Sequence, residues 1–378
     1  MVGGKRMIQL IKFEIYKIMK QKVLWGALVV TLFLAIYFSL QMIGGEIAHL
    51  YKPWEGPISE SKFKRAHIED EKLVKKQESR ELSQEEMFQR TVYGDIFYAE
   101  HFVKLQPEKI KNAQTKSIAA NSNYQKEKYI LEANMLKNIK YNTIEYQRPL
   151  EQSVKFLGTG SLAILAVLII LGVSINYSNE YATGVASYLF TSVYGRKKLL
   201  TAKLFATWII VGIVTLLSTL LPTLFWIIYD DNSGWNSPLQ SVDRFYESPY
   251  AWTIGEYLLI ALAFQILVAI SLSTLALLIS TLCKSVLASV IITTGVIGIP
   301  YLFEIVIPAT FFPDWFPNAI RFTHGQALNA YTLFAKFETI NLFGTPILLP
   351  VAVGIFMAIL IPIMIFYLYK IIKHKELT

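Results

Sequence analysis

The segment NEYATGVASYLFTSVYGRKKLLTAK, residues 179–203, joins two of the most hydrophobic runs of the chain. Its middle is weakly apolar and aromatic, and it begins with one acid, Glu180. It ends with a group of bases, which are Arg196, Lys197, Lys198 and Lys203. A connection between two helices needs only a few residues. This segment is longer, with its acid at the start and its bases at the end, which indicates a role beyond joining two helices. That role depends on the side of the membrane on which the segment lies.

The composition is that of an integral membrane protein. Of the 378 residues, 53% are hydrophobic and only 17% are charged, whereas soluble domains carry about 25% charged residues. Most of the charges lie in one block, residues 44–157. The single cysteine, Cys283, cannot form an internal disulfide, and the five histidines lack the spacing of metal ligands. We therefore expect no metal site and no cofactor bound by this chain.

Six segments are long and apolar enough to cross the hydrocarbon core, which takes about 20 residues of helix. They are approximately 23–43, 158–177, 205–229, 254–280, 286–306 and 346–370. The first is too long for the apolar region of a signal peptide and no small-residue cleavage site follows it, so we expect a retained anchor. The sequence thus predicts an all-α integral membrane protein with six transmembrane helices.

The short connections predict the orientation. With the N-terminus inside, residues 1–22, 178–204, 281–285 and 370–378 would be cytoplasmic, and they carry fourteen bases and three acids. The rest of the chain holds 22 bases and 25 acids. Because basic residues favour the cytoplasmic side, we expect a multi-pass protein of the cell membrane with both termini in the cytoplasm. Bases beside the spans indicate contact with membrane lipids rather than with nucleic acid.

Two parts outside the spans have their own character. Residues 1–22 are predicted to form a cytoplasmic interfacial elbow helix, with Glu14 and Lys17 mostly on its polar face. Residues 44–157 are predicted to form a mostly helical extracytoplasmic domain, inserted between spans one and two, with a possible capping box at Ser83–Glu86.

The remaining residues, 158–372, form the predicted five-span membrane domain. Its outer segment, 307–345, is too polar and too rich in proline to span, yet it is dense in aromatic residues. Aromatic rings favour the headgroup level of the bilayer. Broken helices in the outer leaflet are therefore expected there.

The cytoplasmic segment 178–204 is predicted to contain a short amphipathic helix lying along the membrane. Glu180 would lie at its start, where the helix dipole favours a negative charge, and Gly184 would allow a bend. A helix in this place can receive a push from a cytoplasmic protein and pass it to the second and third spans.

These residues resemble those of a known family. The spacing of Glu180 and Gly184, followed by SYLFTSVYGRKKLLTAK, resembles the loop between spans two and three of the ATP-binding-cassette type-2 exporter permeases. The N-terminal IKFEIYKIMKQK is similar to that family's elbow helix. The resemblance covers residues 7–43 and 158–372 and does not extend to the block 44–157.

The resemblance implies a transport subunit that is not itself an enzyme. Two permease subunits, identical or different, would pair, and a separate cytoplasmic ATPase would bind and hydrolyse ATP. The chain carries no P-loop of its own, which agrees with this division. The residues matching the family's coupling elements are Glu14, Glu180, Gly184, Arg196 and Lys203.

The spans carry no chain of carboxylates or histidines at mid-depth. A pathway would then be lined by apolar and hydroxyl side chains, with candidates Ser271, Ser273, Thr274, Thr293 and Thr294, and this suits an amphipathic cargo such as a peptide, an antibiotic or a lipid-like molecule. The same hydroxyls could instead bond to neighbouring helices. An outer gate would be formed by Trp315, Phe316 and Phe322. The alternative is an envelope sensor, or an assembly or immunity protein, that does not transport.

Overall fold

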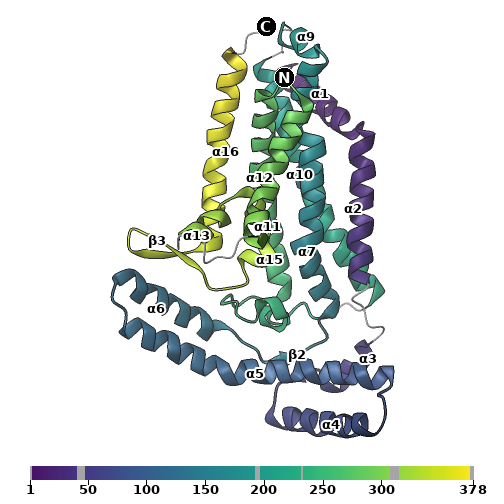
Figure 1. The fold of residues 1–378 in the computed structure, drawn as a ribbon, viewed down its shortest axis with the longest axis vertical. Helices are drawn as coiled ribbons and strands as arrows, with labels where there is room; N and C mark the ends of the chain where they lie inside the picture. Colours follow the sequence, from purple (N-terminus) through teal and green to yellow (C-terminus); the bar gives the residue numbers. More distant parts are fainter. Residues whose placement is uncertain (1, 41–46, 192–195, 231–232, 307–314, 375–378) are drawn as a thin grey trace.

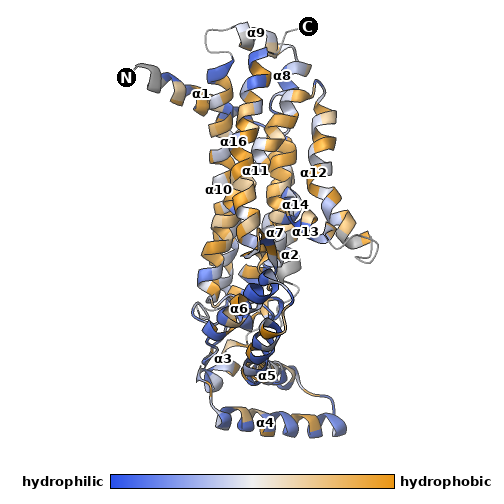
Figure 2. Ribbon diagram, turned by 90° about the vertical axis from the view of Figure 1, so that its left-hand side faces the viewer, coloured by the Kyte–Doolittle hydropathy of each residue, from blue (hydrophilic) through white to orange (hydrophobic). Residues whose placement is uncertain are grey.

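The computed structural model describes residues 2–40, 47–191, 196–230, 233–306 and 315–374. It is a long helical bundle with a smaller helical body at one end (Figure 1). Both ends of the chain lie at the opposite end of the bundle, near the short helix α9 (Val185–Thr191). Apolar residues are concentrated along the bundle and hydrophilic ones in the smaller body (Figure 2).

Five helices are long and apolar enough to cross a membrane, and they match the predicted spans two to six. Their bounds are Arg148–Ala182, Lys197–Tyr229, Ile254–Leu282, Val286–Phe303 and Leu349–His374. The first comprises α7 (Arg148–Val167), the π-helical turn η2 (Leu168–Val173) and α8 (Ser178–Ala182), and the others are α10 (Lys197–Tyr229), α11 (Ile254–Leu282), α12 (Val286–Val306) and α16 (Leu349–His374). α10 packs between α7 and α11, and α16 packs on α11.

The predicted first span corresponds to α2 (Lys22–Leu40). Its apolar part is described over Lys22–Leu34, and residues 41–43 of that prediction lie outside the described residues. The count of six spans therefore stays a prediction. α1 (Val2–Met19) precedes α2 and leaves the bundle sideways near the end that holds the termini (Figure 2).

The smaller body, here called the insertion domain, is helical as predicted. It contains α3 (Ala48–Tyr51), η1 (Lys52–Trp54), β1 (Gly56–Pro57), α4 (Glu60–Ser79), α5 (Gln84–Ile118), α6 (Asn123–Asn138) and β2 (Thr143–Ile144). β1 and β2 pair antiparallel and bring the two ends of the domain together. A separate core packs inside it around Trp54, Ile96 and Phe102.

Two local predictions for the insertion domain can be compared with the structure. The capping box is confirmed, because the Ser83 side chain accepts from the Glu86 amide and the Glu86 carboxylate accepts from the Ser83 amide. The predicted end of the domain at residue 157 falls inside α7, which runs without interruption from Arg148.

The described part of the aromatic outer segment begins at residue 315 and contains the expected broken helices. They are α13 (Phe316–Arg321), α14 (His324–Ala327) and α15 (Ala330–Leu333). A β-hairpin that was not predicted follows, with β3 (Thr339–Leu342) paired to β4 (Thr345–Leu348). Its turn residues Phe343 and Gly344 both have positive φ, 50° and 89°, as the two central residues of a type I′ hairpin turn require.

Candidate functional site

The chain changes its helical form just before the predicted coupling segment. A π-helical turn, η2, follows directly on α7, and such turns are rare and frequently occur at functional sites. The backbone amides of Tyr177 and Ser178 then donate to the hydroxyl of Ser280 in α11, at 2.9 and 3.0 Å. The start of α8 is therefore held against α11.

Four charged side chains and one amide meet beside this point, and we call them the charge cluster: Glu14, Lys17, Asn176, Glu180 and Lys203. The ammonium group of Lys203 donates to Glu14 Oε2 at 3.0 Å, to Glu180 Oε1 at 2.7 Å and to Asn176 Oδ1 at 2.7 Å. Lys17 donates to Glu14 Oε2 at 3.1 Å and also pairs with Glu180. The cluster joins α1, α8 and α10.

The charge cluster is withdrawn from solvent except at Lys17, which is partly exposed. Lys203, Glu14 and Glu180 keep only 0%, 1% and 5% of their surface exposed. Burial works to lower the pKa of Lys17, but the carboxylates of Glu14 and Glu180 outweigh it and raise that pKa above its ordinary value. Two acids and two bases balance in charge, which a buried ionic group requires. Glu14 thus lies on the protein-facing side of α1 rather than on the expected polar face.

The other two predicted coupling residues lie at the same end of the bundle, apart from the cluster. Gly184 joins α8 to α9 with φ of 73°, which fits the predicted bend. The guanidinium Nη1 of Arg196 donates to the carbonyl of Lys373 at 2.9 Å and so ties the start of α10 to the end of α16. The described residues of the segment therefore form two short helices and the first turns of α10 rather than one amphipathic helix.

α9 forms the tip of this end of the molecule (Figure 1). The ring of Tyr188 on α9 is 80% exposed, and Val185 is exposed beside it. Aromatic residues are enriched among those that dominate protein–protein interfaces, so an exposed tyrosine at this tip is suited to contact with another protein.

Comparison with protein families gives one match. A family described as "ABC-2 family transporter protein" matches residues 59–324. The chain belongs to the ABC-2 transporter family. It is accordingly a multi-pass membrane permease of an ABC transporter, a transport subunit and not the catalytic one. No curated protein and no solved structure matches it.

The predicted pathway residues of this ABC-2 permease lie mostly inside the single chain. Ser271, Ser273, Thr274 and Thr293 are buried, whereas Thr294 is exposed. The Ser271 hydroxyl lies 3.0 Å from His324 Nε2, and those of Ser273 and Thr274 donate to the carbonyl of Ile270. Ser271 therefore bonds to a neighbouring helix, which is the alternative that the sequence left open, whereas Ser273 and Thr274 donate within their own helix α11.

The predicted gate residues line the outer segment. Trp315 is exposed, and its ring meets Phe316 edge to face at 5.8 Å. Phe322 packs on Phe356 of α16, with ring centroids 5.4 Å apart. Trp315 is thus exposed, Phe316 is half-buried and Phe322 packs against the core, and a gating role stays a prediction.

Sequence reasoning missed a buried amide in α11. The side chain of Gln265 donates to the carbonyls of Leu157 and Leu328, at 2.9 and 3.1 Å, and accepts from Ser161. It therefore connects α7, α11 and the broken helices within the ABC-2 bundle. A single uncharged amide in an otherwise apolar run was the only signal of this role.

Proposed function

We propose that this permease is the membrane subunit of an exporter in the cell membrane, with its termini in the cytoplasm. A separate ATPase would bind and hydrolyse ATP, and a second permease subunit would complete the pathway. The family membership, the missing P-loop and the basic residues at the end that holds both termini support this proposal.

The observation that carries the proposal is the charge cluster. An ATPase docked on α9 would move α8, and Glu180 would pass that movement to α1 and α10 through Lys203. The transmission would be efficient because separating buried, hydrogen-bonded charges costs several kcal/mol. Glu14, Glu180 and Lys203 would thus transmit the movement. Gly184 would set the angle between α8 and α9, and Arg196 would hold the end of α16 to the start of α10.

We further propose an amphipathic cargo, a peptide, an antibiotic or a lipid-like molecule, moved outward. A route between two subunits would be lined by Thr294 and the apolar surface of α12, and Ser271, Ser273, Thr274 and Thr293 would join it only if the helices separate. Trp315, Phe316 and Phe322 would form the gate on the side of the insertion domain.

ATP-dependent movement in proteoliposomes that contain the permease and its ATPase tests this proposal. A hydrophobic peptide, an antibiotic and a small ion are compared. We expect movement of the peptide or of the antibiotic and no movement of the ion. Movement of the ion alone would refute the proposal.

A further inference from the structure

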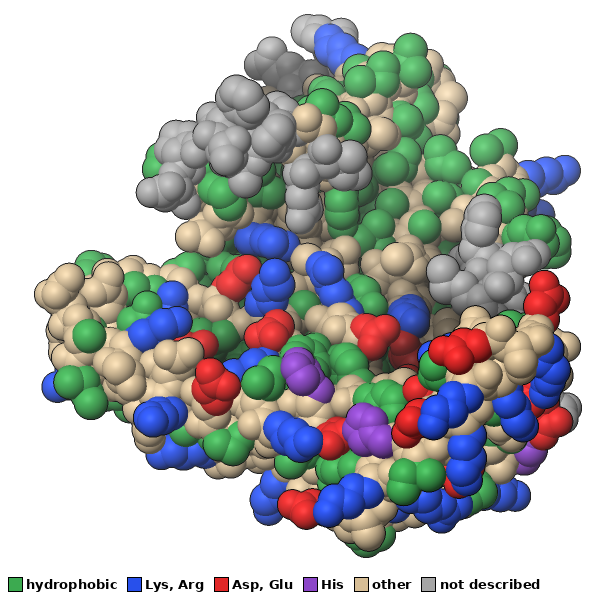
Figure 3. Space-filling model, turned by 60° about the horizontal axis from the view of Figure 1, so that its bottom comes forward, with side chains coloured by type: hydrophobic (Ala, Val, Ile, Leu, Met, Phe, Trp, Pro, Cys, Tyr) green, Lys and Arg blue, Asp and Glu red, His purple; other side chains and the backbone are tan. Residues whose placement is uncertain are grey.

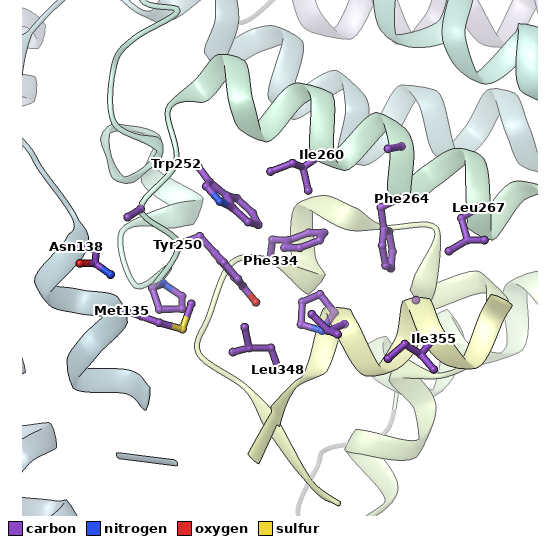
Figure 4. Close-up of a pocket in the computed structure, with 16 residues that line it drawn as sticks. Met135, Asn138, Tyr250, Trp252, Ile260, Phe264, Leu267, Phe334, Leu348 and Ile355 are labelled. Carbon is purple, nitrogen blue, oxygen red and sulfur yellow. The ribbon is translucent and has the colours of Figure 1, made fainter. Parts of the chain in front are cut away.

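An aromatic cavity of about 670 Å³ lies where the insertion domain meets the membrane helices (Figure 4). Its walls include Tyr250 and Trp252 from the segment before α11, Phe264 from α11 and Phe334 after α15. This volume is within the range of ligand sites, about 300–1,000 Å³, and such sites are mostly apolar with a few polar groups.

The mouth of this cavity opens on the surface of two spans. Ile260, Phe264 and Leu267 line it from one face of α11, and Val351 and Ile355 line it from α16. Val351 and Ile355 are also exposed on the outside of the bundle. The cavity is therefore continuous with the apolar surface that these helices present to the bilayer.

One polar group inside the aromatic cavity has no partner. Tyr250 is only 4% exposed, and its hydroxyl makes no hydrogen bond with any residue that the structure describes. Its ring reaches in among Phe334 and Leu348 (Figure 4). An unsatisfied buried hydroxyl is costly, and the ester carbonyl at the start of an acyl chain would accept a hydrogen bond from it.

A second, polar cavity of about 150 Å³ adjoins the first, and Pro249 lines both. It lies between α5 and α6 of the insertion domain, and its charged residues are Lys109, Lys116, Glu132 and Glu247. Lys109 donates to Glu247 at 2.9 Å. Charged side chains of both signs cover this domain, beneath the mostly hydrophobic bundle (Figure 3). Two bases and two acids suit a headgroup that carries one charge of each sign.

We propose that the two cavities form one site for a zwitterionic phospholipid of the bilayer, with an acyl chain in the aromatic cavity and a phosphoethanolamine headgroup in the polar one. The chain would enter between α11 and α16 from the leaflet beside the insertion domain. This site goes beyond the proposed transport function, because its occupancy requires neither ATP nor the ATPase.

The test uses the full chain in nanodiscs of phosphatidylcholine with a small amount of phosphatidylethanolamine that carries a photoreactive group on its acyl chain. Labelling of residues 260–267 and 350–355 should saturate and be displaced by unlabelled phosphatidylethanolamine. Gly354 lines the aromatic cavity, and a Cβ added there would lie 3.4 Å from the ring of Phe264. Gly354→Leu should therefore fill part of the cavity and reduce the labelling by about tenfold. Gly212→Leu in α10, where a Cβ meets nothing within 4 Å, should leave it unchanged.

Two further variants keep the outcome decisive. Ile355→Trp narrows the exposed mouth without entering the core and should also reduce the labelling. Lys116→Gln should weaken displacement by phosphatidylethanolamine but not by diacylglycerol, which lacks the headgroup. Three results would overturn the proposal. The labelling does not saturate, it is equal in Gly354→Leu and Gly212→Leu, or it is replaced by cross-links to a second copy of the chain.

Discussion

Replacing Lys203 by methionine gives the sharpest test of the charge cluster. The change keeps the length and apolar stem of the side chain but removes the ammonium group that bonds to Glu14, Glu180 and Asn176 together. Two buried carboxylates would then share Lys17, which is partly exposed. Removing one member of a buried ion pair costs about 3–5 kcal/mol, so we expect this loss in the free energy of unfolding.

The assay is unfolding in detergent, followed as the loss of monodisperse protein on heating. Lys203→Met should unfold at a clearly lower temperature, whereas Lys197→Met, an exposed lysine on the same helix, should behave like the parent. The double variant Lys203→Met with Glu180→Gln restores the charge balance and should recover most of the loss. If Lys203→Met unfolds at the same temperature as Lys197→Met, or if the double variant unfolds at a lower temperature than the single one, the cluster does not stabilise this end of the bundle.

Three other predictions follow from the described residues. Burial raises the pKa of Asp95 to about 6, against an ordinary 3.8, so the free energy of unfolding of the insertion domain should fall by about 3 kcal/mol as the pH rises from 4 to above 6. Thermal unfolding at pH 5 and pH 7.5 should show this dependence in the parent and not in Asp95→Asn. A dependence that persists in Asp95→Asn would show that another group causes it. A Cβ at Gly325 would lie 2.3 Å from the carbonyl oxygen of Ile297, whereas one at Gly298 meets nothing, so Gly325→Ala should destabilise the bundle by about 1–3 kcal/mol and Gly298→Ala should not; equal melting would contradict the close packing of α14 on α12. With Cys283 replaced by serine, single cysteines at positions 118 and 188 should react with an impermeant maleimide from opposite sides of the membrane, since α5 and α9 lie at opposite ends of the molecule. Labelling of both positions from one side would refute the predicted topology.

The sequence was sufficient for the features that depend on local pattern. Long apolar runs predicted five of the helices, and Ser83 with Glu86 predicted the start of α5 because a capping box requires only residues three apart. The family followed from Glu180, Gly184 and the basic residues after them.

Features that depend on tertiary contact could not be predicted in the same way. Helical period places Glu14 on a face of α1 but does not say whether that face meets lipid, water or Lys203, which is 189 residues away. The hairpin of β3 and β4 turns at Phe343, a residue type seldom found with positive φ. The hydroxyls of Ser271 and Thr274 fit a pathway by composition, and only the packed bundle shows that Ser271 lies against His324 and that Thr274 accepts from Trp208.

We propose that a separate ATPase works on this permease through α9. Purification of the chain from its own membranes in mild detergent, followed by measurement of ATP hydrolysis in the purified sample, tests it most directly. Hydrolysis should be lost in Tyr188→Asp, at the exposed tip of α9, and kept in Ile118→Asp, which places the same charge on the exposed end of α5. Hydrolysis absent from the parent sample, or equal in both variants, would contradict it.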